Sequence, residues 1–388
     1  MKKSLAALLI FSFTLTSTSH LWAADPKPGA KCLRAGQIGT IPGYKFKCIK
    51  VKNKLVWDKG TSTAPKAPSS STPKASASPA PTSDPYLISP ASINSFQDAV
   101  TRYKDIKYWA WKRAAIEVEK NTSSESILNV LVGPNSKECS DAGTRAIRAM
   151  QKLYSESQLP VKSTLIYAAK EDNTWTKSAI NGSFPDSNPP QDAFGVNTKS
   201  EAFILHSDYC NSKDVMAISG AAIAHGYTHS LQKIQYLESK ENWGNFPRWL
   251  IEGGATFSEN FIQYGKDYKT WITNPGFHNW DLKQYDNNFY RDFYDYKLQS
   301  DGKYTWVHTD QWPNQRVYDV GSYACEVLIA IKGPSSIIRL NSEFAKSGNF
   351  EKSFEIVYGL SWKEALPLLA SAVHQSTTWL VNTPNGLK

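Results

Sequence analysis

The pattern of apolar and polar positions divides the chain into a short strand-rich segment and a long mixed segment. Over residues 45–54, lysines alternate with Phe46, Cys48 and further apolar residues, the period of two that is typical of strands. After residue 90, helical periodicity and short apolar runs take turns. The expected elements there are helices at about 93–120, 138–157, 213–237 and 247–264, strands at 127–132, 161–168 and 201–205, and a mostly helical part from 316 onward.

A few strands followed by a long run of helices indicate the α+β class. Residues 61–85 are rich in Ser, Thr, Ala, Pro and Lys and contain no large apolar residue, so we expect a disordered, extended linker there. This linker separates a small module, residues 25–60, from a large domain, residues 86–388. In so small a module, two or three strands would need one disulfide to hold them together.

The first residues have the pattern of a signal peptide, residues 1–24. Two lysines precede an apolar stretch over residues 5–15, and Ala23 and Ala24 provide small residues at a cleavage site. No later segment is apolar over the roughly 18 positions that a membrane span needs. We therefore expect a secreted or cell-wall-associated protein with no transmembrane span in its mature chain.

Export would make the five cysteines available for disulfides. Cys32 and Cys48 lie close together in the small module and are the expected pair. The pairing of the other three stays open; we favour Cys139 with Cys210, which lie in polar, loop-like surroundings. Cys325 lies in an apolar helical stretch and is expected to be a buried thiol.

Positive charge is concentrated near the start of the chain. Residues 25–85 contain eleven Lys or Arg and three acidic residues, a net charge of +8, whereas the whole chain carries +9. Because the signal peptide adds two lysines, residues 86–388 have a net charge of −1. The small module therefore favours an anionic surface such as wall polymer or lipid headgroups, with added solubility as the alternative. Nucleic acid is a poor candidate partner for an exported protein.

Candidate metal ligands lie in two separate segments. His225 and His229 are four residues apart on an expected helix, so both rings lie on one face and can reach one ion. Catalytic zinc sites use three protein ligands, which calls for a third side chain. Glu252 is an acidic residue in an apolar stretch beside two glycines. A buried carboxylate needs a partner, and a zinc ion held by the two histidines would be one.

These two segments resemble the gluzincin metallopeptidases, in which H-E-x-x-H is followed by a glutamate on the next helix. The resemblance is to the pattern H-E-Y-T-H-x-x-Q, then W-L-x-E-G-x-A, and it extends over most of residues 125–375. The matching positions are His225, Tyr227, Thr228, His229, Gln232, Trp249, Leu250, Glu252, Gly253 and Ala255. The resemblance implies one zinc ion held by His225, His229 and Glu252, and a domain with a small sheet, an active-site helix and a helical C-terminal part.

The chain departs from the family pattern at Gly226, where the family has its catalytic glutamate. That glutamate takes a proton from metal-bound water and passes it to the leaving amine, and glycine can do neither. Thr228, Ser230 and Glu259 are candidate substitutes, although none has the family's geometry. The resemblance also covers a Y-x-x-G helix at Tyr318, whose hydroxyl would stabilise an oxyanion, with Tyr323 behind it; a packing role is the alternative.

Three functions agree with these patterns. The first is a catalytically impaired peptidase homologue that keeps its zinc site and binds peptide or cell-wall material. The second is an active zinc hydrolase with a non-standard base. The third is a non-catalytic, metal-free surface-binding protein. Bound zinc separates the third from the others, and turnover separates the second from the first.

Overall fold

The protein is described by a computed structural model that forms two compact units, Met1–Pro81 and Thr82–Lys388. The expected signal peptide, Cys32, Cys139, Cys210 and residues 63–85 of the expected linker lie outside the described residues. The residues that the structure describes are 31, 35, 38–41, 44–51, 54–62, 91–120, 126–137, 141–180, 193–207, 215–274, 285–295 and 315–382.

The first unit contains a small antiparallel sheet. Its strands are β1 (Ile38–Ile41), β2 (Tyr44–Val51), β3 (Lys54–Trp57) and β4 (Thr61–Ser62), and β2 pairs with all three others. The two or three expected strands are therefore four, and the last lies just beyond residue 60. Phe46, Cys48 and Trp57 form the core of this sheet. The expected disulfide from Cys48 to Cys32 stays a prediction.

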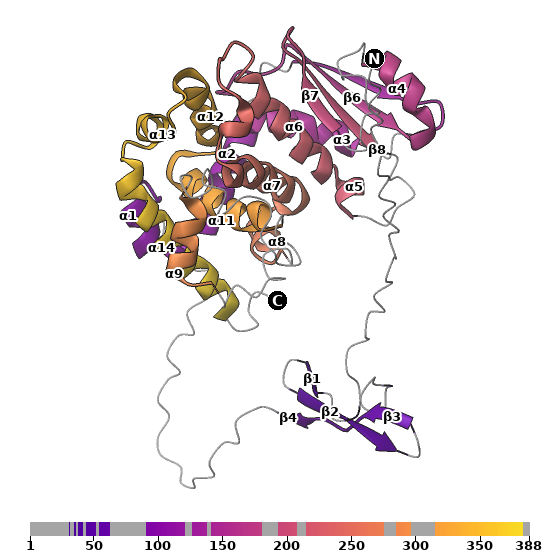
Figure 1. Ribbon diagram of the computed structural model, residues 1–388, viewed down its shortest axis with the longest axis vertical. Helices are drawn as coiled ribbons and strands as arrows, with labels where there is room; N and C mark the ends of the chain where they lie inside the picture. The colour runs from indigo at the N-terminus through magenta and orange to yellow at the C-terminus, as the bar shows by residue number, and fades with distance from the viewer. Residues whose placement is uncertain are drawn as a thin grey trace, which may run out of the picture. The chain divides into compact units, whose positions relative to one another are not determined.

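The second unit combines a four-stranded mixed sheet with many helices, which confirms the α+β class (Figure 1). The strand order is β5-β6-β8-β7, with β5, β6 and β8 parallel and β7 antiparallel to β8. The strands are β5 (Ile127–Val132), β6 (Lys162–Ala168), β7 (Ala193–Val196) and β8 (Glu201–Ser207).

Helices account for most of the second unit. They are α1 (Phe96–Thr101), η1 (Tyr103–Asp105), α2 (Ile106–Lys120), α3 (Ala142–Leu153), η2 (Lys170–Asp172), α4 (Asn173–Ala179), α5 (Val215–Ser219), α6 (Ala221–Ile234), η3 (Trp243–Asn245), α7 (Arg248–Tyr264), α8 (Tyr268–Ile272), α9 (Asn287–Tyr294), α11 (Gln315–Lys332), α12 (Ser335–Ser347), α13 (Phe350–Tyr358) and α14 (Trp362–Asn382).

The two faces of the mixed sheet are covered by different helices. Successive residues of a strand point to opposite faces of the sheet. Ile166 and Phe203 therefore pack against Trp175 of α4 on one face. Leu165 and Ile204 join the main core on the other face, where α3 and α6 lie against the sheet (Figure 1).

Two of the expected helices are interrupted. The helix expected over 93–120 is divided by the turn of η1 between α1 and α2. The helix expected over 213–237 is divided at Gly220, which adopts a left-handed φ of 82° between α5 and α6. A Cβ at Gly220 would lie 2.6 Å from the carbonyl oxygen of Ala142, so a side chain is excluded there. This break sets the start of α6.

Helix α7 packs against both α6 and α11. At the α7–α11 crossing, a Cβ on Gly253 would collide with the backbone of Gly321, and a Cβ on Gly321 would collide with the carbonyl oxygen of Trp249. The two helices approach this closely because both contact positions are glycine. Tyr318 lies one turn before Gly321, so the crossing determines where Tyr318 sits.

Two further expectations concern burial. Cys325 is a free, fully buried thiol on α11, as its apolar surroundings predicted. Within the described ranges, no helix is long and apolar enough to cross a bilayer.

The α7–α11 crossing can be tested by comparing two Gly→Ala substitutions inside buried helices. Gly321→Ala should destabilise the protein by about 1–3 kcal/mol, because the new methyl group meets backbone atoms that cannot move aside. Gly226→Ala should be neutral or stabilising by up to about 1 kcal/mol, because its nearest neighbour would be 3.5 Å away. Urea unfolding measures both, and equal effects of the two substitutions would contradict the packing described.

Candidate metal centre

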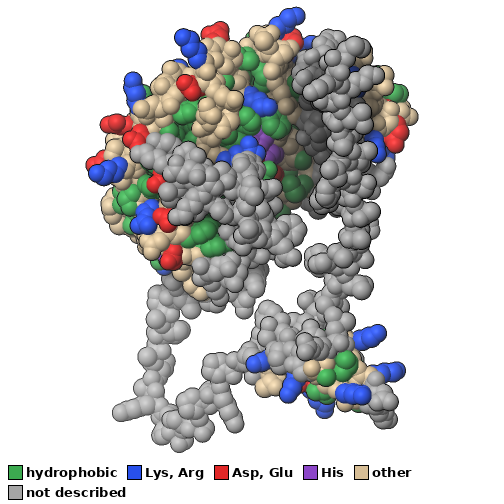
Figure 2. Space-filling model, in the orientation of Figure 1, with side chains coloured by type: hydrophobic (Ala, Val, Ile, Leu, Met, Phe, Trp, Pro, Cys, Tyr) green, Lys and Arg blue, Asp and Glu red, His purple; other side chains and the backbone are tan. Residues whose placement is uncertain are grey.

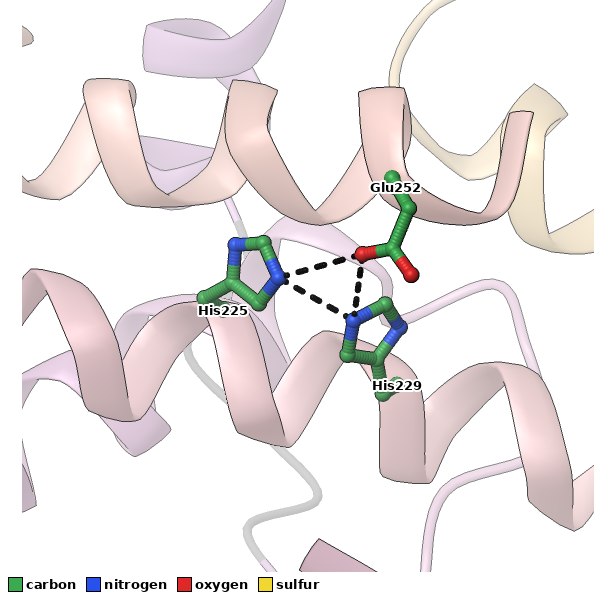
Figure 3. A group of neighbouring side chains, drawn as sticks. All are labelled: His225, His229 and Glu252. Atoms are coloured by element: carbon green, nitrogen blue, oxygen red, sulfur yellow. Dashed lines mark hydrogen bonds and ion pairs between the residues drawn. The ribbon is translucent and has the colours of Figure 1, made fainter. Parts of the chain in front are cut away.

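His225 and His229 project from α6 toward Glu252 on the adjacent helix α7 (Figure 3). The Nε2 atoms of the two histidines are 3.1 Å apart. Oε2 of Glu252 lies 3.1 Å from Nε2 of His229 and 3.5 Å from Nε2 of His225. The three residues predicted from the sequence to act together therefore meet at one point.

The spacing of these three atoms matches the needs of a small metal ion. Zinc bonds of about 2.0–2.1 Å at tetrahedral angles place ligand atoms about 3.3 Å apart, close to the distances observed here. Oε2 of Glu252 is buried and makes no hydrogen bond of good geometry; its polar neighbours are the two imidazole nitrogens. A buried carboxylate oxygen in this position is costly unless a cation satisfies it. His225, His229 and Glu252 are thus suited to hold a divalent metal.

Each candidate ligand is oriented by a second contact. Nδ1 of His225 lies 2.9 Å from Oε2 of Glu259, and Nδ1 of His229 lies 2.9 Å from Oε1 of Gln232. Gln232 is itself held by its amide, which donates to the carbonyl of Ile251. A proton on each Nδ1 leaves the lone pair of Nε2 facing the centre, which is the tautomer that a metal requires. The other oxygen of Glu252 pairs with Arg248, one helical turn earlier.

Burial and neighbouring charges give the two histidines different pKa values. Burial alone would lower the pKa of His225, but contacts with Glu252 and Glu259 raise it to about 9. Burial lowers the pKa of His229. For Glu252, burial is outweighed by the two histidines and Arg248, which hold its pKa well below the usual range. Without a metal, the centre therefore holds one proton that a cation would have to displace.

Aromatic side chains surround His229 and leave His225 more accessible. Phe194 of β7 stacks on the His229 ring at 4.6 Å, and Trp243 meets the same ring edge-on at 5.7 Å. The ammonium of Lys233 lies over both of these rings. The His225 side chain is 16% exposed and that of His229 4%, so the centre opens on the His225 side. Figure 2 shows histidine atoms at the surface beside basic and hydrophobic side chains.

Tyr318 lies at this open side of the centre. Its ring stacks on the His225 ring at 5.7 Å, and its side chain is hydrogen-bonded to Arg248. Burial and the charge of Glu252 raise the pKa of Tyr318, which keeps its hydroxyl protonated and able to donate. Tyr323, in contrast, is buried in the core with its ring next to Lys107.

No general base occupies the position next to His225. A Cβ on Gly226 would point toward Ile204 and Phe194, with ordinary van der Waals separations of 3.5 and 3.8 Å. The three candidate substitutes are engaged elsewhere. Thr228 donates to the carbonyl of Ala224, Ser230 points back at the carbonyl of Gly226, and Glu259 contacts the outer nitrogen of His225. None of these three presents a carboxylate or hydroxyl to the ligand side of the centre.

Some contributors to the site were not predicted from the sequence. Gln232 was part of the matching pattern, but its contact with His229 was not expected. Arg248 stands four residues before Glu252, a helical spacing that could have identified this ion pair. No sequence pattern pointed to Phe194 or Trp243 as part of the site. Phe194 lies on β7, a strand that was not expected, and Trp243 lies in η3 between α6 and α7.

The fold and this site together define an α+β protein with a two-histidine, one-glutamate candidate metal centre on adjacent helices. No protein-family model, curated protein or solved structure that was compared with the chain matches it.

The raised pKa of His225 makes the stability of the metal-free protein depend on pH. A histidine that binds its proton more tightly when folded stabilises the fold at low pH, and this contribution is lost as pH rises through the folded pKa. In chelator, the melting temperature should therefore fall between pH 6.5 and about 9. The lowered pKa of His229 acts in the opposite direction and below this range.

His225→Gln is the matched variant, because it keeps a polar side chain but cannot titrate. Its melting temperature in chelator should stay flat over the same pH range. Saturating zinc should also remove the decline in the wild type, since metal binding requires the neutral ring. An equal decline in wild type and variant would assign the effect to another group.

Proposed function

We propose that residues 86–388 form a gluzincin-like domain that binds one zinc ion and has lost efficient peptidase activity. The protein would be exported, through the signal peptide expected over residues 1–24, and would be secreted or associated with the cell wall. Its metal centre would bind peptide or cell-wall material. The observation that carries the proposal is the convergence of His225, His229 and Glu252 at distances close to those of a tetrahedral site.

The choice of zinc rests on the chemistry of the donor set. Two imidazole nitrogens and one carboxylate oxygen are a common ligand set of catalytic zinc, which leaves further positions for water or substrate. The second contacts of His225 and His229 favour this choice, because metal-bound histidines generally donate their other N–H group to an oxygen. A bound zinc ion would polarise a carbonyl group and lower the pKa of a bound water.

The loss of peptidase activity is proposed from Gly226. Peptide hydrolysis requires a proton to be taken from water and delivered to the leaving amine, and loss of a positioned general base typically lowers the rate about 10²–10⁴-fold. Tyr318 supports binding of a carbonyl group, because its ring stacks on His225 at the open side of the centre and its hydroxyl stays protonated. Without a base to activate water, a hydrogen bond from this hydroxyl to a ligand carbonyl would contribute to binding but not lead to efficient cleavage.

A peptide ligand is favoured by the position of β7. Among the described strands, β7 pairs only with β8, so it is the edge strand of the described sheet. Helix α6, which carries both histidines, packs against β7, and Phe194 of this strand stacks on His229. An extended peptide that adds to this edge would pass close to the metal centre.

Zinc binding is the first test. The chain freed of metal should bind one zinc ion, measured by calorimetry and by elemental analysis of the purified protein. Glu252→Gln keeps the size of the side chain but removes its charge, and should weaken binding at least about tenfold. Glu355→Gln, at an exposed position on α13, is the matched control and should bind as the wild type does. Absence of binding, or equal affinity of the two variants, would refute the zinc proposal.

Turnover is the second test. The wild type loaded with zinc should cleave unstructured peptides poorly or not at all, and any residual activity should favour activated esters, whose leaving groups need no proton. Gly226→Glu should increase peptide cleavage, because a Cβ fits at this position. Gly226→Gln is its control: similar in shape, it cannot accept the proton and should stay inactive. Efficient zinc-dependent cleavage by the wild type, abolished by His229→Ala, would instead establish an active hydrolase.

A further inference from the structure

The small sheet of the first unit has one face that its own core does not use. Along β2, Phe46 and Cys48 point into the core, so Lys45, Lys47 and the following odd-numbered residues point to the opposite face. Two of these, Ile49 and Val51, are aliphatic and 38% and 46% exposed. Both side chains are therefore presented to solvent instead of to the core of the sheet.

The strand register completes this outer face. In antiparallel pairs, directly opposite residues place their side chains on the same face. Val51 is opposite Lys54, Ile49 is opposite Val56, and Val56 is also bridged to Lys31 on its other side. We call this surface the lysine–aliphatic face; its members are Lys31, Lys45, Lys47, Ile49, Val51, Lys54 and Val56.

The two faces of the sheet differ in character. The inner face holds Phe46, Cys48, Trp57 and the packed Leu55, together with one exposed lysine, Lys50. The lysine–aliphatic face holds four exposed lysines around its aliphatic residues. Figure 2 shows basic and hydrophobic side chains next to each other on this unit.

Acidic side chains do little to neutralise the lysines. Among the described residues of this unit, Asp58 is the only acid. Its Oδ1 accepts hydrogen bonds from the backbone amides of Lys47 and Gly60, which orients the carboxylate into the turn. The positive potential of the face is therefore retained.

We propose that the lysine–aliphatic face docks on an anionic lipid bilayer, with its ammonium groups at the lipid phosphates and Ile49 and Val51 in shallow contact with the acyl region. Charge complementarity determines the sign of the partner, and the aliphatic residues distinguish a bilayer from a hydrated polymer. A hydrated polyanion would interact favourably only with the lysines, whereas a bilayer would also remove the exposed aliphatic surface from water. Lysine stems can lie along such apolar surface while their charges stay in the headgroups.

This inference does not rest on the metal centre, which belongs to the other compact unit. It makes the expected attraction to anionic surfaces more specific in two respects: the partner is lipid, and one face of the sheet makes the contact. It thereby predicts that two lysines of the same strand, Lys47 and Lys50, contribute unequally.

The test is co-sedimentation of the chain from Asp25 onward, which lacks the apolar leader, with lipid vesicles. The wild type should bind vesicles that contain phosphatidylglycerol and should not bind pure phosphatidylcholine. Lys47→Gln should weaken binding about fivefold, the typical contribution of one lysine near an anionic membrane. Lys50→Gln removes the same charge from the opposite face and should have a clearly smaller effect.

The aliphatic contribution is tested with Ile49→Thr and Val51→Thr combined, which keeps β-branched residues in the strand. This variant should lose about tenfold in affinity for the anionic vesicles. Salt dependence is measured on the wild type, so no substitution can disturb folding in this test. Its binding should weaken with added salt but remain measurable at high salt. A soluble poly(glycerol phosphate) serves as the polymer probe.

Three results would overturn the proposal. The first is absence of binding to phosphatidylglycerol vesicles. The second is equal loss for Lys47→Gln and Lys50→Gln. The third is binding to the soluble polymer as tight as to vesicles, abolished by salt and insensitive to Ile49 and Val51, which would assign the face to wall polymer.

Discussion

The close crossing of α7 and α11 at Gly253 and Gly321 is the contact on which the candidate metal centre depends. It holds α7 between α6 and α11, so that Glu252 faces the two histidines of α6 while Tyr318 of α11 stacks on the ring of His225. Side chains at either glycine would separate the helices, because their Cβ atoms would meet backbone. The glycines in W-L-x-E-G and Y-x-x-G are thus geometric requirements of the site.

This domain contains two buried groups of charged side chains, and they differ in how far their carboxylate oxygens are paired. Nζ of Lys107 lies 2.7 Å from both oxygens of Glu326, so the charges pair completely inside the core. Glu252 instead has one oxygen paired with Arg248 and the other directed at two imidazoles without good hydrogen-bond geometry. The first group joins α2 to α11 and needs no ligand. The second has an atom that only a cation would satisfy fully, and it lies where His225 reaches solvent.

Gly226 lies inside α6, where glycine carries a conformational cost. Glycine inside a helix is about 1 kcal/mol less favourable than alanine, and nothing nearby requires glycine, since a Cβ there would have ordinary contacts. In this respect Gly226 differs from Gly253 and Gly321, which no side chain can replace without displacement of a helix. The structure supplies no packing reason for glycine at this position.

The sequence alone determined the features that depend on local spacing. The period of two identified the strand now seen as β2, short apolar runs identified β5, β6 and β8, and the four-residue spacing placed both histidines on one face of α6. Those interactions extend over only a few residues, so a pattern in the chain is enough to reveal them. Only the tertiary structure decided how Glu252 meets the histidines, which residues orient their rings, and that Phe194 and Trp243 enclose His229. These contacts join segments far apart in the chain, and their distances follow from how whole helices and strands pack, which no local pattern records.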